Sequence, residues 1–349
     1  MSDDTQTDGL IDLSKLEAWM DREGLPGRGE PLKVRSISGG ASNEIFELRR
    51  GDEQMVLRRP PRNVPKGRNE TMLREYRVLA ALKDSDVPHA HALGACDDPD
   101  VLGASFYLMD FVEGWSPIST PGEWPAPFDL DLAARKGLAH ELIDAIANLG
   151  QVDWRAVGLE GFGKPEGFLE RQVDRWQHHL AGFQFRPIPG IDEAGEWLRA
   201  HIPRSYTTGI IHGDYQFANV MFRHGAPARM AAVVDWEMAT IGDPLLDLAW
   251  VLMGWPEDPG QEVNQSYVDY AGMPSRDDLM HRYASRSGLP VDEIDYYIVL
   301  ARFKMAIVLE QGYARFVKGG ADNPKMQSFG DIVLEMAKRA AELAKSSRL

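Results

Sequence analysis

The hydrophobic pattern of this chain changes its period partway along, and that change constrains the fold more than any other feature. Up to about residue 112, alternating or continuous apolar stretches predict strands, whereas from about residue 130 apolar residues recur mainly at helical spacing. Strands followed by helices favour the α+β class. We therefore expect two lobes, an N-terminal lobe of residues 1–112 and a mainly helical lobe of residues 113–349.

The first part of the chain predicts a small sheet with helices beside it. Residues 13–24 have the pattern of a helix, with Ser14 as the expected N-cap and Gly24 after the end. A second helix is expected at residues 69–84, after a proline-rich loop. Extended stretches, of which the first three predict an antiparallel meander, occur at residues 32–38, 43–50, 54–59 and 104–114.

The second part contains three short apolar runs among its helical patterns, and polar residues gather around them. The runs are GIIHG, NVMF and AAVVDW, within residues 209–236. A helix should follow in GDPLLDLAWVL, where Asp243 is the expected cap and Pro244 occupies the first position. Residues from distant parts of the chain could therefore meet where these short strands end.

Composition excludes several classes of function. The formal charge of -15, with no basic stripe, argues against nucleic-acid binding. The single cysteine, Cys96, excludes an internal disulfide framework and a four-thiolate zinc site. The start MSDDTQTDG lacks the pattern of a signal peptide, and the most apolar segment is too short to cross a bilayer. We expect a cytoplasmic protein without a membrane partner.

Asp214, Asn219 and Asp235 carry the strongest chemical signal. Asp214 and Asn219 lie five residues apart, and Asp235 follows an apolar run from which a neighbouring strand would release it. Carboxylate and carboxamide oxygens suit Mg2+, which completes its shell with phosphate and water. A separate carboxylate can orient a hydroxyl and accept its proton. The bland alternative is a polar turn in which these side chains cap their own backbone.

The motifs HGDYQFAN and VVDWE together resemble the catalytic and metal motifs of the aminoglycoside phosphotransferase family, relatives of protein and choline kinases. The resemblance implies a bilobed protein-kinase-like fold. It implies that Asp214 is the catalytic base, that Asn219 and Asp235 bind Mg2+, and that His212 supports the loop. Asp247 matches an acid that braces the catalytic loop, although a simple helix-start charge is an equal alternative.

The same resemblance covers most of the chain, because other motifs occur in the expected order. The segment SGGASN matches a loop over the ATP phosphates, with Gly39, Gly40, Ser42 and Asn43 as nucleotide-binding residues. Arg58 stands where the family has a phosphate-pairing lysine, and Glu75 matches the helix glutamate that holds that lysine. An arginine keeps the charge, so Arg58 could pair with both Glu75 and a phosphate.

The segment YLMDFVEG resembles the hinge between the lobes of such enzymes. Adenine would bond there to the Asp110 carbonyl and the Val112 N–H. Within the family, the kinase-like domains joined to some acyl-CoA dehydrogenases look most similar, given SGGASN, LRRPP, HGDYQFANVMF and GDPLLDLAW. The acceptor stays open: an aminoglycoside, another amino compound, or a CoA-like or hydroxyacyl molecule. The oligomeric state stays open as well.

Several other features have two readings. Glu237 could assist a cation or be solvated, and five cations between Arg58 and Arg68 could meet an anionic substrate or only face water. The aromatic residues from Trp154 to Phe183 could line an acceptor pocket, but core packing is favoured. The sequence GFGKPEG lacks the ending of a phosphate loop, and the His89–His91 pair lacks a third metal ligand.

These observations predict an enzyme that transfers the γ-phosphoryl group of ATP, with Mg2+, to a hydroxyl of a small molecule. A second hypothesis is a nucleotide-binding module without useful catalysis, which the arginine at position 58 motivates. A third makes His212, Asp214 and Asp235 ligands of a hydrolytic transition-metal site.

Overall fold

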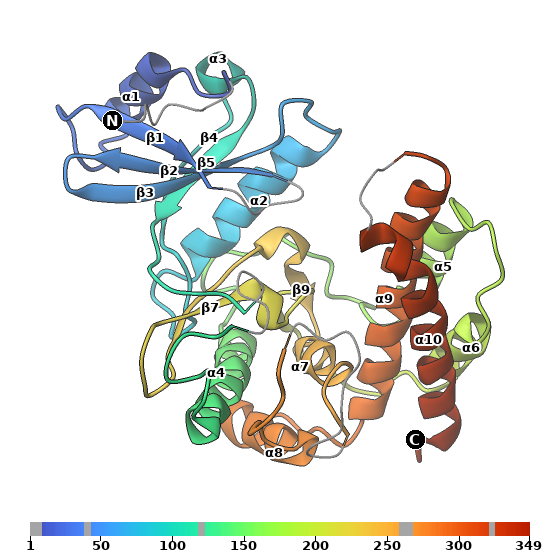
Figure 1. Cartoon of the computed structure of the whole chain (residues 1–349). Coiled ribbons are helices and arrows are strands. Elements are labelled where there is room, and N and C mark those ends of the chain that lie inside the picture. The colour runs from blue at the N-terminus through green and yellow to red at the C-terminus, as the bar shows by residue number, and fades with distance from the viewer. Residues whose placement is uncertain (1–8, 38–42, 118–122, 258–267, 321–324) are drawn as a thin grey trace.

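The computed structural model describes residues 9–37, 43–117, 123–257, 268–320 and 325–349. Its N-terminal part is an antiparallel sheet of five strands, which lies above the helices of the remaining chain in Figure 1. The strands follow the order β1-β2-β3-β5-β4. Their bounds are β1 Leu32–Ser36, β2 Glu44–Arg50, β3 Glu53–Arg59, β4 Ala92–Cys96 and β5 Phe106–Asp110. The predicted meander is thereby confirmed.

One face of this sheet packs against α1 (Leu13–Arg22) and the short α3 (Pro99–Leu102). Trp19 of α1 meets Phe106 of β5 edge to face, with ring centroids 4.9 Å apart. The predicted cap of α1 was wrong by two residues. Asp12, not Ser14, caps the helix, because the Asp12 carboxylate accepts the Lys15 N–H at 3.1 Å.

Two features of the sheet differ from the prediction. Strand β4 was not predicted, because ALGAC has small side chains around a single leucine and no β-branched or aromatic residue. Strand β5 ends at Asp110 rather than near residue 114. Beyond it the chain leaves the sheet, and Trp115 pairs with Phe222 through backbone bonds of 2.9 and 2.8 Å. This pairing joins the segment after β5 to the strand that contains Phe222.

Helix α2 (Arg68–Ala81) packs between the sheet and the helical part. Its buried residues Met72, Val78 and Leu79 belong to the large hydrophobic core that extends through the helices. Its arginines also reach across: Arg74 donates to the carbonyls of Phe162 and Ala239 at 2.8 and 3.3 Å. Arg77 donates to the carbonyls of Gly158 and Glu160 at 2.8 and 2.7 Å. Helix α2 is therefore fastened to the helical part.

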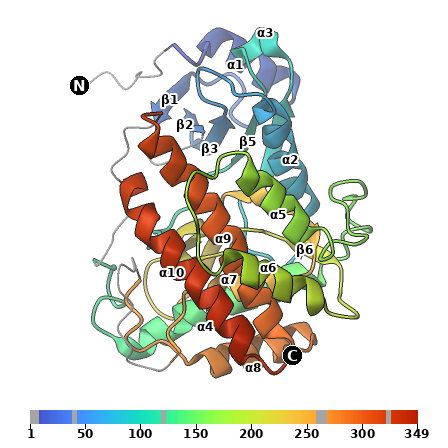
Figure 2. The same cartoon turned by 90° about the vertical axis from the view of Figure 1, so that its right-hand side faces the viewer.

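The remaining chain is mostly helical, as predicted. Helices α5, α6, α9 and α10 lie side by side in Figure 2, and α4, α7 and α8 lie beneath the sheet in Figure 1. Their bounds are α4 Leu132–Gln151, α5 Gln172–Ala181, α6 Ile191–Ala200, α7 Leu245–Leu252, α8 Arg276–Ser287, α9 Ile294–Val317 and α10 Lys325–Ser346. No helix within the described part of the chain is long and apolar enough to span a bilayer.

Short strands and single turns between α6 and α7 carry the polar motifs. They are β6 Gly209–Ile211, η1 Phe217–Asn219, β7 Val220–Phe222, β8 Met230–Val233, η2 Trp236–Met238 and β9 Thr240–Gly242. Strand β6 pairs with β9, and β7 pairs with β8, both antiparallel. Helix α7 begins one residue later than expected, yet the Asp243 carboxylate still accepts the Leu245 N–H at 3.0 Å. The division between lobes at residue 112 stays a prediction.

Candidate active site

The β7–β8 hairpin brings the two predicted metal ligands together. Val220 faces Val233 in the register, so Asn219 directly precedes one strand at the end where Asp235 follows the other. The backbone closes this end, because the Val234 N–H donates to the Asn219 carbonyl at 2.9 Å. Asn219 and Asp235, which are sixteen residues apart in the sequence, therefore lie at the same end of the hairpin.

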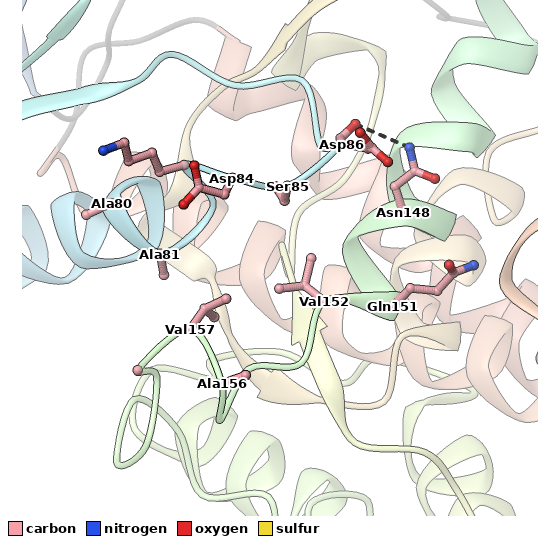
Figure 3. Close-up of a pocket in the computed structure, with 12 residues that line it drawn as sticks. Ala80, Ala81, Asp84, Ser85, Asp86, Asn148, Gln151, Val152, Ala156 and Val157 are labelled. Atoms are coloured by element: carbon pink, nitrogen blue, oxygen red, sulfur yellow. Dashed lines mark hydrogen bonds between the residues drawn. The ribbon is translucent and has the colours of Figure 1, made fainter.

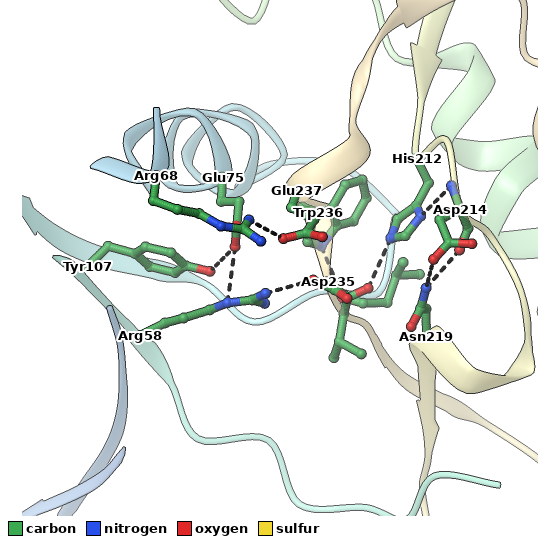
Figure 4. Close-up of polar contacts among 12 residues, drawn as sticks. Arg58, Arg68, Glu75, Tyr107, His212, Asp214, Asn219, Asp235, Trp236 and Glu237 are labelled. Carbon is green, nitrogen blue, oxygen red and sulfur yellow. Dashed lines mark hydrogen bonds and ion pairs between the residues drawn. The ribbon is translucent and has the colours of Figure 1, made fainter. Parts of the chain in front are cut away.

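Asp235 adopts a backbone conformation that its residue type disfavours. Its φ of 65° lies in the left-handed region, and no other non-glycine residue in the described part of the chain has a positive φ. Such a conformation costs about 1 kcal/mol for an L-residue. It turns the chain from β8 into η2. The Asp235 side chain reaches back toward the sheet, where Arg58 donates to it at 2.6 Å (Figure 4).

The loop before Asp214 is held by α7. The Asp247 carboxylate accepts the N–H groups of His212 and Gly213 at 2.6 and 2.9 Å. Burial raises the pKa of Asp247, which His212 and the two backbone bonds oppose. Of the two predicted alternatives for Asp247, the structure shows bracing of this loop.

His212 makes fixed hydrogen bonds, as expected. Its Nε2 lies 2.9 Å from the Val234 carbonyl, and its Nδ1 lies 3.4 Å from the Asp214 N–H. Both ring nitrogens therefore face the backbone, with Nε2 as the donor. The ring is fully buried, against Trp236 and Tyr215. His212 supports the loop and links it to the β8 strand.

Asp214 is surrounded by donors. Its Oδ1 accepts from Gln216 Nε2 and Trp250 Nε1, both at 2.8 Å, and its Oδ2 accepts from Asn219 Nδ2 at 2.9 Å. Three donors hold the carboxylate in one orientation. Trp250 was not predicted as a site residue. It lies on α7 three residues after Asp247, so both residues are on one face of the helix. Asp247 holds the loop backbone before Asp214, and Trp250 holds the Asp214 side chain.

Arg58, Glu75 and Tyr107 form a buried chain of contacts that leads to Asp235 (Figure 4). Arg58 Nε lies 3.3 Å from Glu75 Oε2, and the Tyr107 hydroxyl donates to the same oxygen at 2.9 Å. Arg58 and Tyr107 are cross-strand partners of β3 and β5. Burial raises the pKa of Glu75 to about 7, although Arg58 and Tyr107 lower it. Tyr107 was missed because strand register is not readable from sequence.

Much of the predicted basic loop is already paired within the chain. Arg68 forms an ion pair with Glu237 at 2.7 Å, which gives Glu237 a protein partner rather than only water. Arg58 pairs with Glu75 and Asp235, and Arg59 donates to the Leu10 carbonyl. Three of the five cations therefore have partners within the chain, and contact of this loop with an anionic substrate stays a prediction.

Among the other predicted nucleotide-binding residues, Asn43 and Asp110 lie at the sheet. Gly39, Gly40 and Ser42 fall outside the described residues, and Asn43 is buried directly before β2. At the end of β5, where the hinge was predicted, the Asp110 N–H donates to the His91 carbonyl at 2.9 Å, and the Asp110 carboxylate faces the His91 ring. Adenine binding by the Asp110 carbonyl and the Val112 N–H stays a prediction.

The donor set at the hairpin end fits a magnesium ion better than a transition metal. It offers one carboxylate and one carboxamide, hard oxygens that leave room for phosphate and water. The third hypothesis loses its nitrogen ligand, because His212 is engaged on both ring nitrogens. Within the described part of the chain, no group of three or more His, Cys, Asp or Glu residues could hold a metal.

The remaining sequence features serve packing. Trp154, Phe162, Phe168 and Trp176 are buried core residues, as favoured, and Phe183 packs against that core. The GFGKPEG segment docks on α2, where Arg74 lies 4.1 Å above the Phe162 ring. A cavity of about 750 Å³ lies between the ends of α2 and α4 (Figure 3). None of the predicted site residues lines it, so it is not the predicted nucleotide site.

Comparison with known proteins identifies relatives of this chain. Residues 33–284 match the model of the phosphotransferase enzyme family. Acyl-CoA dehydrogenase family member 11 of Gallus gallus is 31% identical over 324 residues, which is 90% of this chain and 40% of the relative. The human protein of that name is 29% identical, over 96% of this chain and 43% of its own length. The chain thus spans less than half the length of these relatives.

Solved structures show the same fold. A protein from Ralstonia eutropha, assigned to the aminoglycoside phosphotransferases, is 33% identical, with a TM-score of 0.83 over 97% of this chain and all of that one. A thermostable mutant of an aminoglycoside phosphotransferase, in a complex with ADP and hygromycin B, has a TM-score of 0.60. At 13% identity over 95% of this chain and 99% of that one, it supports the kinase-like fold alone.

Proposed function

The chain belongs to the phosphotransferase enzyme family, and from this membership we propose that it transfers the γ-phosphoryl group of ATP to a hydroxyl of a small molecule. The observation that supports the proposal most directly is the run of contacts from Glu75 through Arg58 to Asp235. These contacts connect Arg58, a buried cation of the sheet, to the end of the β7–β8 hairpin. Asn219 lies at the same hairpin end, and its amide donates to Asp214.

Each residue has a role that follows from its surroundings. Arg58 would hold an ATP phosphate, with Glu75 and Tyr107 fixing its guanidinium from behind. Asp214, oriented by three donors, would accept the proton of the attacking hydroxyl as the oxygen–phosphorus bond forms. The bond from the γ-phosphorus to the bridging oxygen breaks in the same step, and ADP leaves. Positioning and charge stabilisation supply most of the rate in such a reaction.

Asn219 and Asp235 would hold Mg2+, which neutralises phosphate charge when bound. Asp235 now contacts Arg58 at 2.6 Å, so metal binding requires this carboxylate to share or exchange its partner. The Asn219 amide nitrogen donates to Asp214, which leaves the amide oxygen as the atom suited to a cation.

The first test is the substitution Asp214→Asn. We expect ADP release from Mg-ATP to fall by about 100-fold or more, because the amide cannot accept the proton. Mg-ATP binding, measured by calorimetry, should remain. The matched control is Asp192→Asn, the same chemical change at an exposed position of α6. If the Asp214→Asn variant transferred phosphate to any acceptor as fast as wild type, Asp214 would not be the catalytic base.

The second candidate function is a nucleotide-binding module without useful catalysis. The contact between Arg58 and the predicted metal ligand Asp235 favours it, since that contact competes with metal binding. This function predicts Mg-ATP binding with no ADP release above the Asp214→Asn background for any acceptor. ADP release that depends on Asp214 rules it out.

The acceptor is to be found by a screen. Three classes follow from the relatives and from the charge of the chain: aminoglycosides, other hydroxylated amino compounds, and hydroxyacyl-CoA compounds. The bound hygromycin B of a fold relative motivates the first, and the names of the acyl-CoA dehydrogenase relatives motivate the last. ADP release with each class, in wild type and Asp214→Asn, identifies the acceptor.

A further inference from the structure

Lys304 is a buried cation that neither the sequence motifs nor the proposed mechanism uses. It lies in the middle of α9, and only 6% of the residue is exposed. An unpaired ammonium in such a place is costly, so its partners are informative. Its Nζ donates to the Gly213 carbonyl at 2.7 Å and lies 4.5 Å from the centre of the Trp250 ring. Both partners adjoin Asp214 directly.

The first partner fixes the backbone that carries Asp214. Gly213 has a φ of 83°, and a Cβ there would lie 2.6 Å from the Met238 carbonyl oxygen, so only glycine fits. Asp247 holds the N–H of this glycine and Lys304 holds its carbonyl. The backbone directly before Asp214 is therefore held by hydrogen bonds to one residue of α7 and one residue of α9.

The second partner fixes the side chain of Asp214. The Trp250 indole N–H donates to Asp214 Oδ1 at 2.8 Å, while the ammonium of Lys304 lies over the same indole ring. A cation over a π face withdraws electron density from the ring, which makes the N–H a stronger donor. A second indole, Trp176, lies 5.6 Å from the ammonium and helps to enclose it.

We propose that Lys304 is a positioning residue that orients Asp214 through the Gly213 carbonyl and the Trp250 ring. The proposal rests on the proposed role of Asp214 as the base. Lys304 does not touch the acceptor or ATP in this account. Its positive charge sets the direction of the carboxylate, and the carboxylate acts on the substrate.

The titration of Lys304 gives the proposal a pH signature. Burial lowers its pKa to about 8, Asp214 and Asp247 raise it, and Arg175 of α5 lowers it further. The ammonium is therefore charged at pH 7 and loses its proton as the pH rises through about 8. A neutral amine no longer attracts the Trp250 ring and donates more weakly to Gly213.

The test compares Lys304→Met and Trp250→Phe with wild type, by ADP release from Mg-ATP with water as the acceptor. We expect kcat to fall about 10-fold to 100-fold in each variant, with the KM for ATP nearly unchanged. Wild-type kcat should fall as the pH rises through about 8, and the Lys304→Met profile should lack that fall. The double variant should lose little more than either single variant, because both act on one contact chain.

The control is Lys338→Met, the same change at an exposed position of α10 with a side chain 63% exposed. Trp250→Phe keeps an aromatic ring beside the ammonium but removes the indole N–H and part of the ring surface, so it remains informative if Lys304→Met does not fold. Wild-type kcat in both variants, or an alkaline fall retained in Lys304→Met, overturns the proposal.

A second readout does not need turnover. Backbone amides of residues 209–222 should exchange hydrogen faster in Lys304→Met than in wild type and Lys338→Met. Unchanged exchange overturns the proposal. If wild type itself neither binds nor consumes Mg-ATP, the proposed function fails, while this exchange measurement still decides whether Lys304 holds the loop.

Discussion

Glu75 is the residue whose surroundings give the clearest dependence on pH. It is almost fully buried, and its Oε1 has no hydrogen-bond partner among the described residues. Burial raises its pKa to about 7 from the model-peptide value of 4.5. A carboxyl with a raised folded pKa stabilises the fold below its unfolded pKa, and loses that contribution as the pH rises through the folded value.

We therefore predict that wild type loses stability relative to Glu75→Gln between pH 5.5 and pH 8. The loss should be on the order of 2 kcal/mol, because it reflects about 1.5 pH units of differential protonation. Urea unfolding of both proteins at the two pH values measures it. Exposed Glu335→Gln, on α10, is the control. A constant difference between Glu75→Gln and wild type across this range would contradict the prediction.

Spacing alone could indicate only residues whose partners are close in sequence, whereas Arg58, Glu75 and Asp247 were named from the family resemblance. Asp214 and Asn219 share one loop, and Asp235 follows the next strand, so their spacing carried the signal. Lys304 lies 91 residues along the chain from its partner Gly213, and Trp250 lies 36 residues from its partner Asp214. The only sequence hint for Lys304 is a lysine inside the apolar run YYIVLARFKMAIVL.

At the scale of elements, α2 depends on arginines that satisfy carbonyls of the helical part. Arg74→Ala removes two charged hydrogen bonds and a cation–π contact with Phe162. We predict a loss of about 2 kcal/mol in the free energy of unfolding. Mg-ATP affinity should also fall, because Glu75 lies on the same helix. Urea unfolding and calorimetry test both effects.

The matched control for that prediction is Arg22→Ala on α1, where the arginine side chain is 62% exposed and its partner is the adjacent Glu23. It should change stability by less than about 0.5 kcal/mol. Equal effects of the two substitutions would show that the carbonyl contacts of α2 contribute nothing.

Element type was predictable where apolar period and turn residues agreed. The β1-β2-β3 meander and the helices α1, α2 and α7 met this condition. Strand β4 did not, since Ala and Gly carry too little apolar surface to signal a strand, and β5 supplies its pairing. The cap of α1 depended on which of two neighbouring polar residues reached the free N–H groups, a choice of backbone geometry that sequence leaves undecided.

At the scale of the whole molecule, the proposed ligand joins the sheet to the helical part. Arg58 belongs to β3, whereas Asn219 and Asp235 flank the β7–β8 hairpin. We predict that Mg-ATP at about 100 times its Kd raises the free energy of unfolding by about 2.7 kcal/mol. Thermal unfolding measures this shift. ATP with a chelator should give a smaller one, and equal shifts with and without Mg2+ would contradict metal binding at this hairpin.

The overall arrangement could be predicted from the family resemblance as much as from the hydrophobic pattern of the sequence. The change of period indicated two parts, and the resemblance supplied their order and contacts. Neither indicated that the apolar face of α2 would join the core of the helical part. That outcome depends on which of two surfaces the helix covers, and the sequence of one helix does not specify its neighbour.

Asp235 has a consequence for how this chain could change by mutation. A glycine at that position would relieve the left-handed backbone conformation, but it would also remove the carboxylate that pairs with the buried Arg58. A carboxylate thus stands at a position where the backbone alone would favour glycine, and both the pairing with Arg58 and the proposed binding of Mg2+ need that carboxylate.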